Sequence, residues 1–167
     1  MKSLKTALLI AILALVGNTA LAQHVRETNI KKGKEHIPGY TVKLHHSKSQ
    51  AREVICAQMA DAGYTKAKHK KGFAIYKGIL LHNISPTKAD YYIKVKGNKR
   101  KAHIYFIASK GYDNYVTREN DAAMAGKIDD YLESLVDKID AQAKIEQKEK
   151  QKQQLEKDIK KLGAEQK

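Results

Sequence analysis

The side chains best suited to binding a metal ion are seven histidines: His24, His36, His45, His46, His69, His82 and His103. A zinc site on a helix needs a second ligand three or four residues after the first, and no two of these histidines have that spacing. His45 and His46 are adjacent, but neighbouring residues of a strand point to opposite faces of a sheet. The sequence therefore predicts neither a metal site nor a bound cofactor.

Acid–base and nucleophilic catalysis are also poorly supported. Asp90 is the single carboxylate within the predicted strands, so paired carboxylates are missing there. Cys56 follows Ile55 on a predicted helix, where we expect a buried small hydrophobic side chain, because no base is identified beside it. Asp113, in the sequence GYDNY, is expected to form a turn that leads into a helix. The sequence predicts that the protein is not an enzyme.

Residues 70–76 read KKGFAIY, which begins like the RNA-contacting strand of an RNA-recognition domain. Residues two apart in a strand share a face, so a base-stacking platform would need aromatic side chains at positions 73, 75 and 77. Phe73 meets that requirement, whereas Ile75 and Lys77 do not. The following residues also read as a hairpin where the RNA-recognition fold needs a helix. We therefore expect no specific RNA binding.

The elements that must position these residues follow from apolar periodicity. Residues 40–46, YTVKLHH, alternate like a half-buried strand. A helix is predicted over Ser49–Ala62, with Ser47 and Gln50 at the spacing of a capping box. Four further strands are predicted at about 64–69, 73–84, 90–96 and 101–109, because turn signals separate β-branched and aromatic runs.

A second amphipathic helix is predicted from an apolar stripe in its first half, made of Met124, Ile128, Tyr131, Leu132, Leu135 and Ile139. Helical composition continues to Leu162, which corresponds to a length of about 60 Å. A domain of this size is only about 35 Å across, so half of the helix must extend beyond it. The predicted fold class is α+β: an antiparallel sheet of about five strands with two helices packed on one face, the last helix long.

The extension carries a weak heptad pattern in which four of six core positions are apolar: Ile145, Leu155, Ile159 and Leu162. Lys148 and Lys152 occupy the other two core positions. Two interpretations stay open: a solvated, partly frayed single helix, or a coiled coil with a copy of itself or with another helix. The four apolar residues are the candidate helix-pairing residues.

The first residues resemble a secretory signal peptide. Lys2 and Lys5 precede an apolar run over residues 7–16, and Ala20-Leu21-Ala22 provides small residues for cleavage before Gln23. The apolar run is too short to span a bilayer as a helix, and Cys56 lies too far from the cleavage point to carry a lipid. We expect an exported protein, periplasmic or extracellular, that is not a lipoprotein and keeps no transmembrane segment.

The predicted organisation has four parts: a signal peptide over 1–22, a polar leader over 23–39, an α+β domain over 40–143 and a charged helical tail over 144–167. Net charge is +14, and residues 23–110 hold 19 Lys and Arg against 5 Asp and Glu. Two turn-associated clusters are candidate anion-binding residues: Lys66, Lys68, Lys70 and Lys71, and Lys94, Lys96, Lys99, Arg100 and Lys101. They suit an anionic lipid, glycan or extracellular nucleic acid, or they protect strand edges and keep the protein soluble.

The segments ADYYIKVKG and HIYFIASKGYDNYV, with the acidic helix and the Lys/Glu/Gln-rich tail that follow, resemble a group of uncharacterised small secreted proteins of Bacteroidota. The local resemblance is strongest in SKGYDNYV. It implies an envelope location and provides no catalytic residues. The preferred function is an exported, non-enzymatic, envelope-associated binding or assembly protein whose tail pairs with a protein partner or with itself. The alternative is a polyanion-binding protein that uses the basic hairpins.

Overall fold

The computed structural model describes residues 24–165, with side chains described as far as residue 161. The predicted signal peptide lies outside the described residues. Six antiparallel strands form one sheet in the order β1-β2-β6-β5-β4-β3. The elements are β1 (Arg26–Lys32), β2 (Glu35–Leu44), α2 (Lys48–Asp61), β3 (Lys68–Lys70), β4 (Phe73–Ile79), β5 (Ala89–Gly97), β6 (Ala102–Ser109) and α3 (Ala122–Glu165). The α+β class is confirmed, with six strands instead of about five.

The additional strand lies in the segment predicted to be a polar leader. β1 pairs with the first half of β2, and Ile30 and Ile37 face each other in the register and are both buried. These two isoleucines are isolated among polar residues, so the alternation is too sparse to read from the sequence. Pro38 is tolerated within β2 because the pairing of β2 with β6 begins only at Tyr40.

The β5–β6 hairpin lies where the sequence predicts two strands, at about 90–96 and 101–109. Tyr91 pairs with Ala108, Ile93 with Phe106 and Val95 with Ile104, and all six side chains are buried. They belong to the main core, together with the apolar faces of α2 and α3. The Phe106 ring links the sheet to α3, since its centroid lies 5.7 Å from that of Tyr131.

β3 and β4 are shorter than the predicted strands over 64–69 and 73–84. The Tyr64 hydroxyl donates to the Leu80 carbonyl at 3.2 Å and accepts from the Leu80 N–H at 3.0 Å. It therefore occupies backbone groups that a longer β4 would use in pairing. Gly78 has a positive φ of 60° at an irregularity of β4, and its N–H donates to Asp90 instead.

The first helix, α2, begins with the predicted capping box. Ser47 Oγ accepts from the Gln50 N–H, and Gln50 Oε1 accepts from the Ser47 N–H, both at 3.2 Å. Gly63 follows the helix with a φ of 88°, the left-handed conformation that commonly ends helices. α2 turns one side to the main core through Ala51, Val54, Ile55 and Met59.

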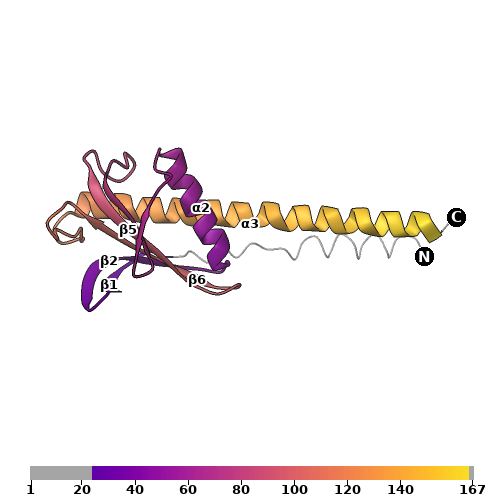
Figure 1. The fold of residues 1–167 in the computed structure, drawn as a ribbon, viewed down its shortest axis with the longest axis horizontal. Coiled ribbons are helices and arrows are strands. Elements are labelled where there is room, and N and C mark those ends of the chain that lie inside the picture. Colours follow the sequence, from indigo (N-terminus) through magenta and orange to yellow (C-terminus); the bar gives the residue numbers. More distant parts are fainter. Residues whose placement is uncertain (1–23, 166–167) are drawn as a thin grey trace, which may run out of the picture.

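The long helix α3 begins after Asp121, whose carboxylate accepts from the Met124 N–H at 3.0 Å. All six residues of the predicted stripe are buried, and Ile139 is the last buried residue of α3 as far as residue 161. Beyond it, α3 leaves the sheet and projects as a single rod (Figure 1). The expectation that only the first half of the helix packs on the domain is confirmed.

The other face of the sheet holds a second apolar cluster, made of Ile30, Ile37, Phe73, Tyr92 and Ile107. Ile75, Tyr105 and Tyr115 are partly buried against it. Both helices therefore pack on one face, and this second cluster lies on the face that they leave open. Within residues 24–165, neither helix combines the length and the apolar character needed to cross a membrane.

Candidate functional site

The two predicted basic clusters meet on the face of the sheet opposite the helices. Lys94 Nζ donates to the Lys71 carbonyl oxygen at 3.1 Å, which joins the β3–β4 turn to β5. Lys68 and Lys70 of β3 pair with Ile75 and Phe73 of β4, so they share the face of the second apolar cluster. The sequence placed these cations in separate turns, and the sheet brings them together.

The ammonium groups of three lysines lie over aromatic rings of this face. Lys32 Nζ lies 3.9 Å from the centroid of the Tyr92 ring, and Lys94 Nζ lies 4.7 Å from that of Phe73. Lys96 Nζ lies 5.8 Å from the centroid of Tyr105. These distances suit cation–π attraction, with the ammonium groups above the rings. We call Lys32, Lys68, Lys70, Lys94 and Lys96 the basic face.

No lysine of the basic face forms an ion pair with a carboxylate among the described residues, although the charges of Asp113 and Glu35 partly offset the effect of burial on the pKa of Lys32. None of the nine candidate anion-binding residues forms an ion pair with a carboxylate within the described part of the chain. Asp129 and Asp140 of α3 pair with Arg118 and His46, and Asp121, just before the helix, pairs with Lys110. Because α3 packs on the far side of the sheet, its acidic residues are separated from the basic face.

Two ammonium groups of this face already have lowered affinity for their protons. Burial lowers the pKa of Lys32. The pKa of Lys94 is lowered by burial and, to a smaller extent, by the nearby positive charge of Lys96. An anion placed above these groups would favour their charged forms. Such a ligand would also relieve the repulsion between Lys94 and Lys96.

A hollow of about 130 Å³ opens on the same face between the β1–β2 turn and the β3–β4 turn. Its lining includes the ammonium-bearing Lys32, Lys70 and Lys71, with Glu35 at its rim and Tyr92 among its walls. A Cβ atom on Gly33 would collide with the end of the Lys71 side chain, so the two turns touch. β1 and β3 are opposite edges of the sheet, and their turns meet because the sheet curls around the second apolar cluster.

The remaining candidate cations lie at the margins. Lys99, Arg100 and Lys101 are exposed at the β5–β6 turn, and Lys66 is exposed before β3 begins. The predicted strand at 64–69 would have aligned Lys66 with Lys68 and Lys70, but β3 is limited to Lys68–Lys70. Lys32 is a residue of the basic face that the sequence did not indicate, because its hairpin was taken for a polar leader.

The second candidate surface is the projecting half of α3. Ile145, Leu155 and Ile159 are 52%, 63% and 67% exposed, respectively. Glu146 accepts a hydrogen bond from Gln50 Nε2 at 2.7 Å and is the last residue of α3 to bond to the domain in the described range. We call Ile145, Leu155 and Ile159 the tail seam; the side chain of Leu162, predicted to extend it, lies outside the described side chains.

Residues considered for catalysis are scattered. Cys56 is exposed, so the expectation that it is buried is wrong; it lies beside the buried stripe of α2 and not within it. Asp113 lies in a turn with a positive φ of 58° and accepts from the Tyr115 hydroxyl at 2.8 Å, whereas Asp121 caps α3. Among the described residues, no three His, Cys, Asp or Glu side chains gather as a metal site would require.

Comparison with known proteins found no matching family model, no matching curated protein and no matching solved structure.

Proposed function

We propose that this chain is an exported, non-enzymatic binding protein that assembles with another protein through the projecting half of α3. The observation that carries this proposal is the exposed tail seam on a helix that has left its domain. A single helix is only marginally stable in water when no other element packs on it. Burial of a leucine or isoleucine side chain contributes roughly 1.5–3 kcal/mol, so a partner helix would stabilise this segment.

The partner suited to the seam is an amphipathic helix with carboxylates opposite Lys148 and Lys152. These lysines occupy the second and third of the six core positions, between Ile145 and Leu155. Two identical helices paired in parallel and in register would bring four ammonium groups together at the seam, which disfavours self-pairing. A partner with acidic residues there turns the same positions into attractive contacts. Export is proposed from the signal-like segment of the sequence.

A charge-reversed variant of this chain can serve as the acidic partner helix. A K148E/K152E variant has carboxylates at these two core positions and should pair with the wild-type protein. We expect light scattering to give the mass of a two-chain complex for the mixture and of one chain for each protein alone. The matched control is K150E/K157E, which makes the same charge change on the opposite side of the helix and should give no complex.

Three results would count against the proposal. A mixture that stays monomeric would contradict seam pairing, and a complex formed equally by the control would show that general charge attraction is responsible. If the wild-type protein forms dimers that are lost when residues 144–167 are removed, the partner is a second copy of the chain and not an acidic helix. Cross-linking and pull-down from the native envelope, with the tail-deleted protein as control, would then identify the partner.

The basic face supports a second candidate function, binding of a linear polyanion. The observation that favours it is the separation of charge. Lysines with no carboxylate partner among the described residues lie on one face of the sheet, and the acidic helix lies on the other. Lysine ammonium groups lie over the Tyr92 and Phe73 rings, so this face would act through charge and not through base stacking.

Heparin is a suitable probe for the basic face. We expect the salt concentration that elutes the protein from immobilised heparin to fall strongly in a K70Q/K94Q/K96Q variant. A K144Q/K150Q/K157Q variant loses the same charge from the tail and should elute close to the wild-type protein. Equal losses for the two variants would show that net charge, and not the basic face, governs retention.

A further inference from the structure

A cleft of about 340 Å³ lies between α2 and the β3–β4 hairpin, on the helix side of the sheet. It is separate from the basic face and from the tail seam. Its volume lies at the lower end of the range of about 300–1,000 Å³ found for small-molecule sites. The cleft combines residues from α2, β3, β4 and β5, and nothing in the order of the sequence brings these residues together.

The inner wall of the cleft is apolar and belongs to the main core. Ile55, Ile93 and Val95 are 4%, 3% and 6% exposed, and Ala74 is partly buried beside them. Ala74 pairs with Ile93 across β4 and β5, so its small side chain leaves room above the sheet. A wall of this kind contacts hydrocarbon and excludes water from the inner part of the cleft.

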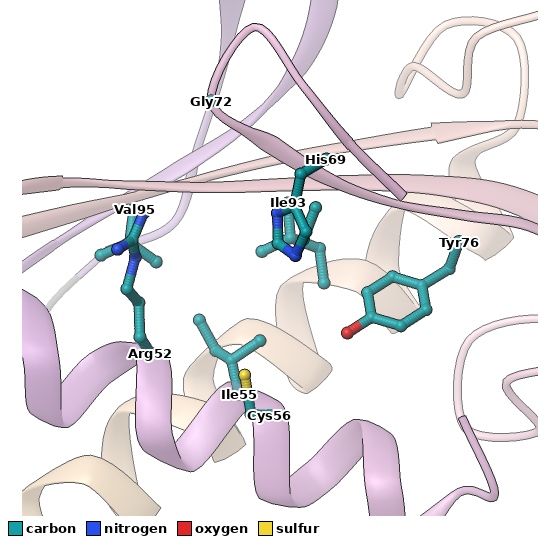
Figure 2. A pocket seen from close by; sticks show the side chains of 9 residues that line it. Arg52, Ile55, Cys56, His69, Gly72, Tyr76, Ile93 and Val95 are labelled. Carbon is teal, nitrogen blue, oxygen red and sulfur yellow. The ribbon is translucent and has the colours of Figure 1, made fainter. Parts of the chain in front are cut away.

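Polar groups converge on the cleft from three sides. Figure 2 shows the Arg52 side chain rising from α2, the His69 ring entering from β3 and the Tyr76 hydroxyl directed inward from β4. Cys56, one turn after Arg52, presents its sulfur between them. The polar part of the lining therefore contains a fixed cation and a phenolic hydroxyl.

Neither the Arg52 guanidinium nor the Tyr76 hydroxyl hydrogen bonds to a side chain within the described part of the chain. No residue that lines the cleft carries a carboxylate. Burial raises the pKa of Tyr76, and the nearby Cys56 contributes in the same direction, so the hydroxyl stays protonated and able to donate. The cleft thus has donors and a positive charge but no anion of its own.

We propose that this cleft binds a small amphipathic carboxylate, with its head held by Arg52 and its hydrocarbon chain against the apolar wall of Ile55, Ile93 and Val95. Arginine recognises a carboxylate through two parallel N–H donors, and such charge-assisted hydrogen bonds are stronger than neutral ones. The apolar wall requires a ligand with a hydrocarbon part, which distinguishes it from inorganic phosphate or sulfate. One anionic head suffices, because Arg52 is the single permanently charged residue of the lining.

Octanoate is the probe, and Cys56 provides a readout specific to the cleft. Cys56 is the chain's single cysteine, it is exposed, and it lines the cleft. We expect octanoate to slow alkylation of Cys56 by iodoacetamide in a saturable manner and to give a matching dissociation constant by calorimetry. Octanol, which has the same chain without the charge, should protect Cys56 at least about tenfold less well.

Two variants test the charged and the apolar part of the cleft, and a third variant is the control. Arg52→Gln should weaken octanoate binding about tenfold or more while leaving octanol unchanged. Ala74→Leu should fill the cleft and weaken both ligands, and its thermal unfolding would show that the domain remains folded. Arg100→Gln removes the same charge from the exposed β5–β6 turn and should bind octanoate like the wild-type protein.

The proposal is overturned by the absence of saturable protection and binding heat in the wild-type protein. It is also overturned if Arg52→Gln and Arg100→Gln bind octanoate equally well, because the assigned head group would then be wrong. If Ala74→Leu were unfolded, the comparison of octanoate with octanol in the Arg52→Gln variant would still decide, since Arg52 is exposed and outside the core.

Discussion

Gly39 of β2 and Phe106 of β6 approach so closely that a Cβ atom on Gly39 would stand 2.6 Å from the Phe106 carbonyl oxygen. The same Cβ would lie 2.7 Å from Ile30 Cδ1 and 2.9 Å from Ile107 Cγ1. The absence of a side chain at Gly39 therefore lets the N-terminal hairpin close over the second apolar cluster. This contact ties β1 and β2, and with them Lys32, to the rest of the basic face.

Gly39→Ala should consequently destabilise the fold. The added methyl group meets backbone and packed isoleucines, and overpacking of this kind typically costs about 1–3 kcal/mol. Gly126→Ala is the matched control, since nothing lies within 4 Å of its added Cβ atom. In the helix α3 that change should stabilise the protein by up to about 1 kcal/mol. Urea denaturation measures both, and equal stability of Gly39→Ala and the wild-type protein would contradict the close approach.

Removal of the α3 cap should weaken the helix at the end that is packed on the sheet. Asp121 accepts from the Met124 N–H and pairs with Lys110, and loss of an N-terminal cap costs about 0.5–2 kcal/mol. Asp121→Ala should therefore unfold at a lower urea concentration. Asp137→Ala, an exposed position with no side-chain bond among those described, should change stability little.

The contribution of Asp121 should also depend on pH. The hydrogen bond from Lys110, followed by that from the Met124 N–H, lowers the pKa of Asp121 from 3.8. A carboxyl group with a lowered folded-state pKa stabilises the protein fully above its unfolded pKa. The difference in stability between the wild-type protein and Asp121→Ala should thus be constant near neutral pH and shrink as the pH falls below 3.8. A difference that grew on acidification would contradict this assignment.

The sequence predicts those features that local patterns encode. The capping box of Ser47 and Gln50, the β5–β6 hairpin and the long final helix each depend on neighbouring residues, and each is confirmed. The N-terminal hairpin was missed because Ile30 and Ile37 gain their burial from the opposite edge of the sheet and not from nearby residues. Curling of the sheet, which brings the turns at Gly33 and Lys71 together, has no local signature.

The candidate sites show the same division. The cations were visible as clusters in the sequence, but their common face depends on strand order and on the register of β3, β4 and β5. The cleft of Arg52, His69 and Tyr76 was invisible, because its residues are individually unremarkable and come from three separate elements. Spacing in the sequence can reveal a site on one helix or strand, but not one that forms between them.

Two tyrosines give a matched test of how buried hydroxyls affect stability. The Tyr91 hydroxyl is a buried group without a hydrogen-bond partner in the described structure, whereas the Tyr64 hydroxyl makes two bonds to the backbone of Leu80. Removal of an unsatisfied hydroxyl is neutral or stabilising, and removal of a satisfied one costs about 1–3 kcal/mol. Tyr91→Phe should therefore match or exceed the wild-type stability, and Tyr64→Phe should fall below it. The opposite order would show that the Tyr91 hydroxyl has a partner, such as an internal water molecule.

Alkaline pH should affect the stability of the wild-type protein and of Tyr91→Phe differently. Burial, with a smaller effect from Tyr64, raises the pKa of Tyr91 from 10.0 to about 12. Because the folded-state pKa is raised, the unfolded chain releases this proton first, and stability is lost as pH rises from 10 toward 12. Tyr91→Phe should lose less stability over that interval than the wild-type protein does, as measured by urea denaturation at each pH. If Tyr91→Phe and the wild-type protein lost equal stability between pH 10 and pH 12, the Tyr91 hydroxyl would have the same pKa in the folded and unfolded states. That result would contradict its burial in the core.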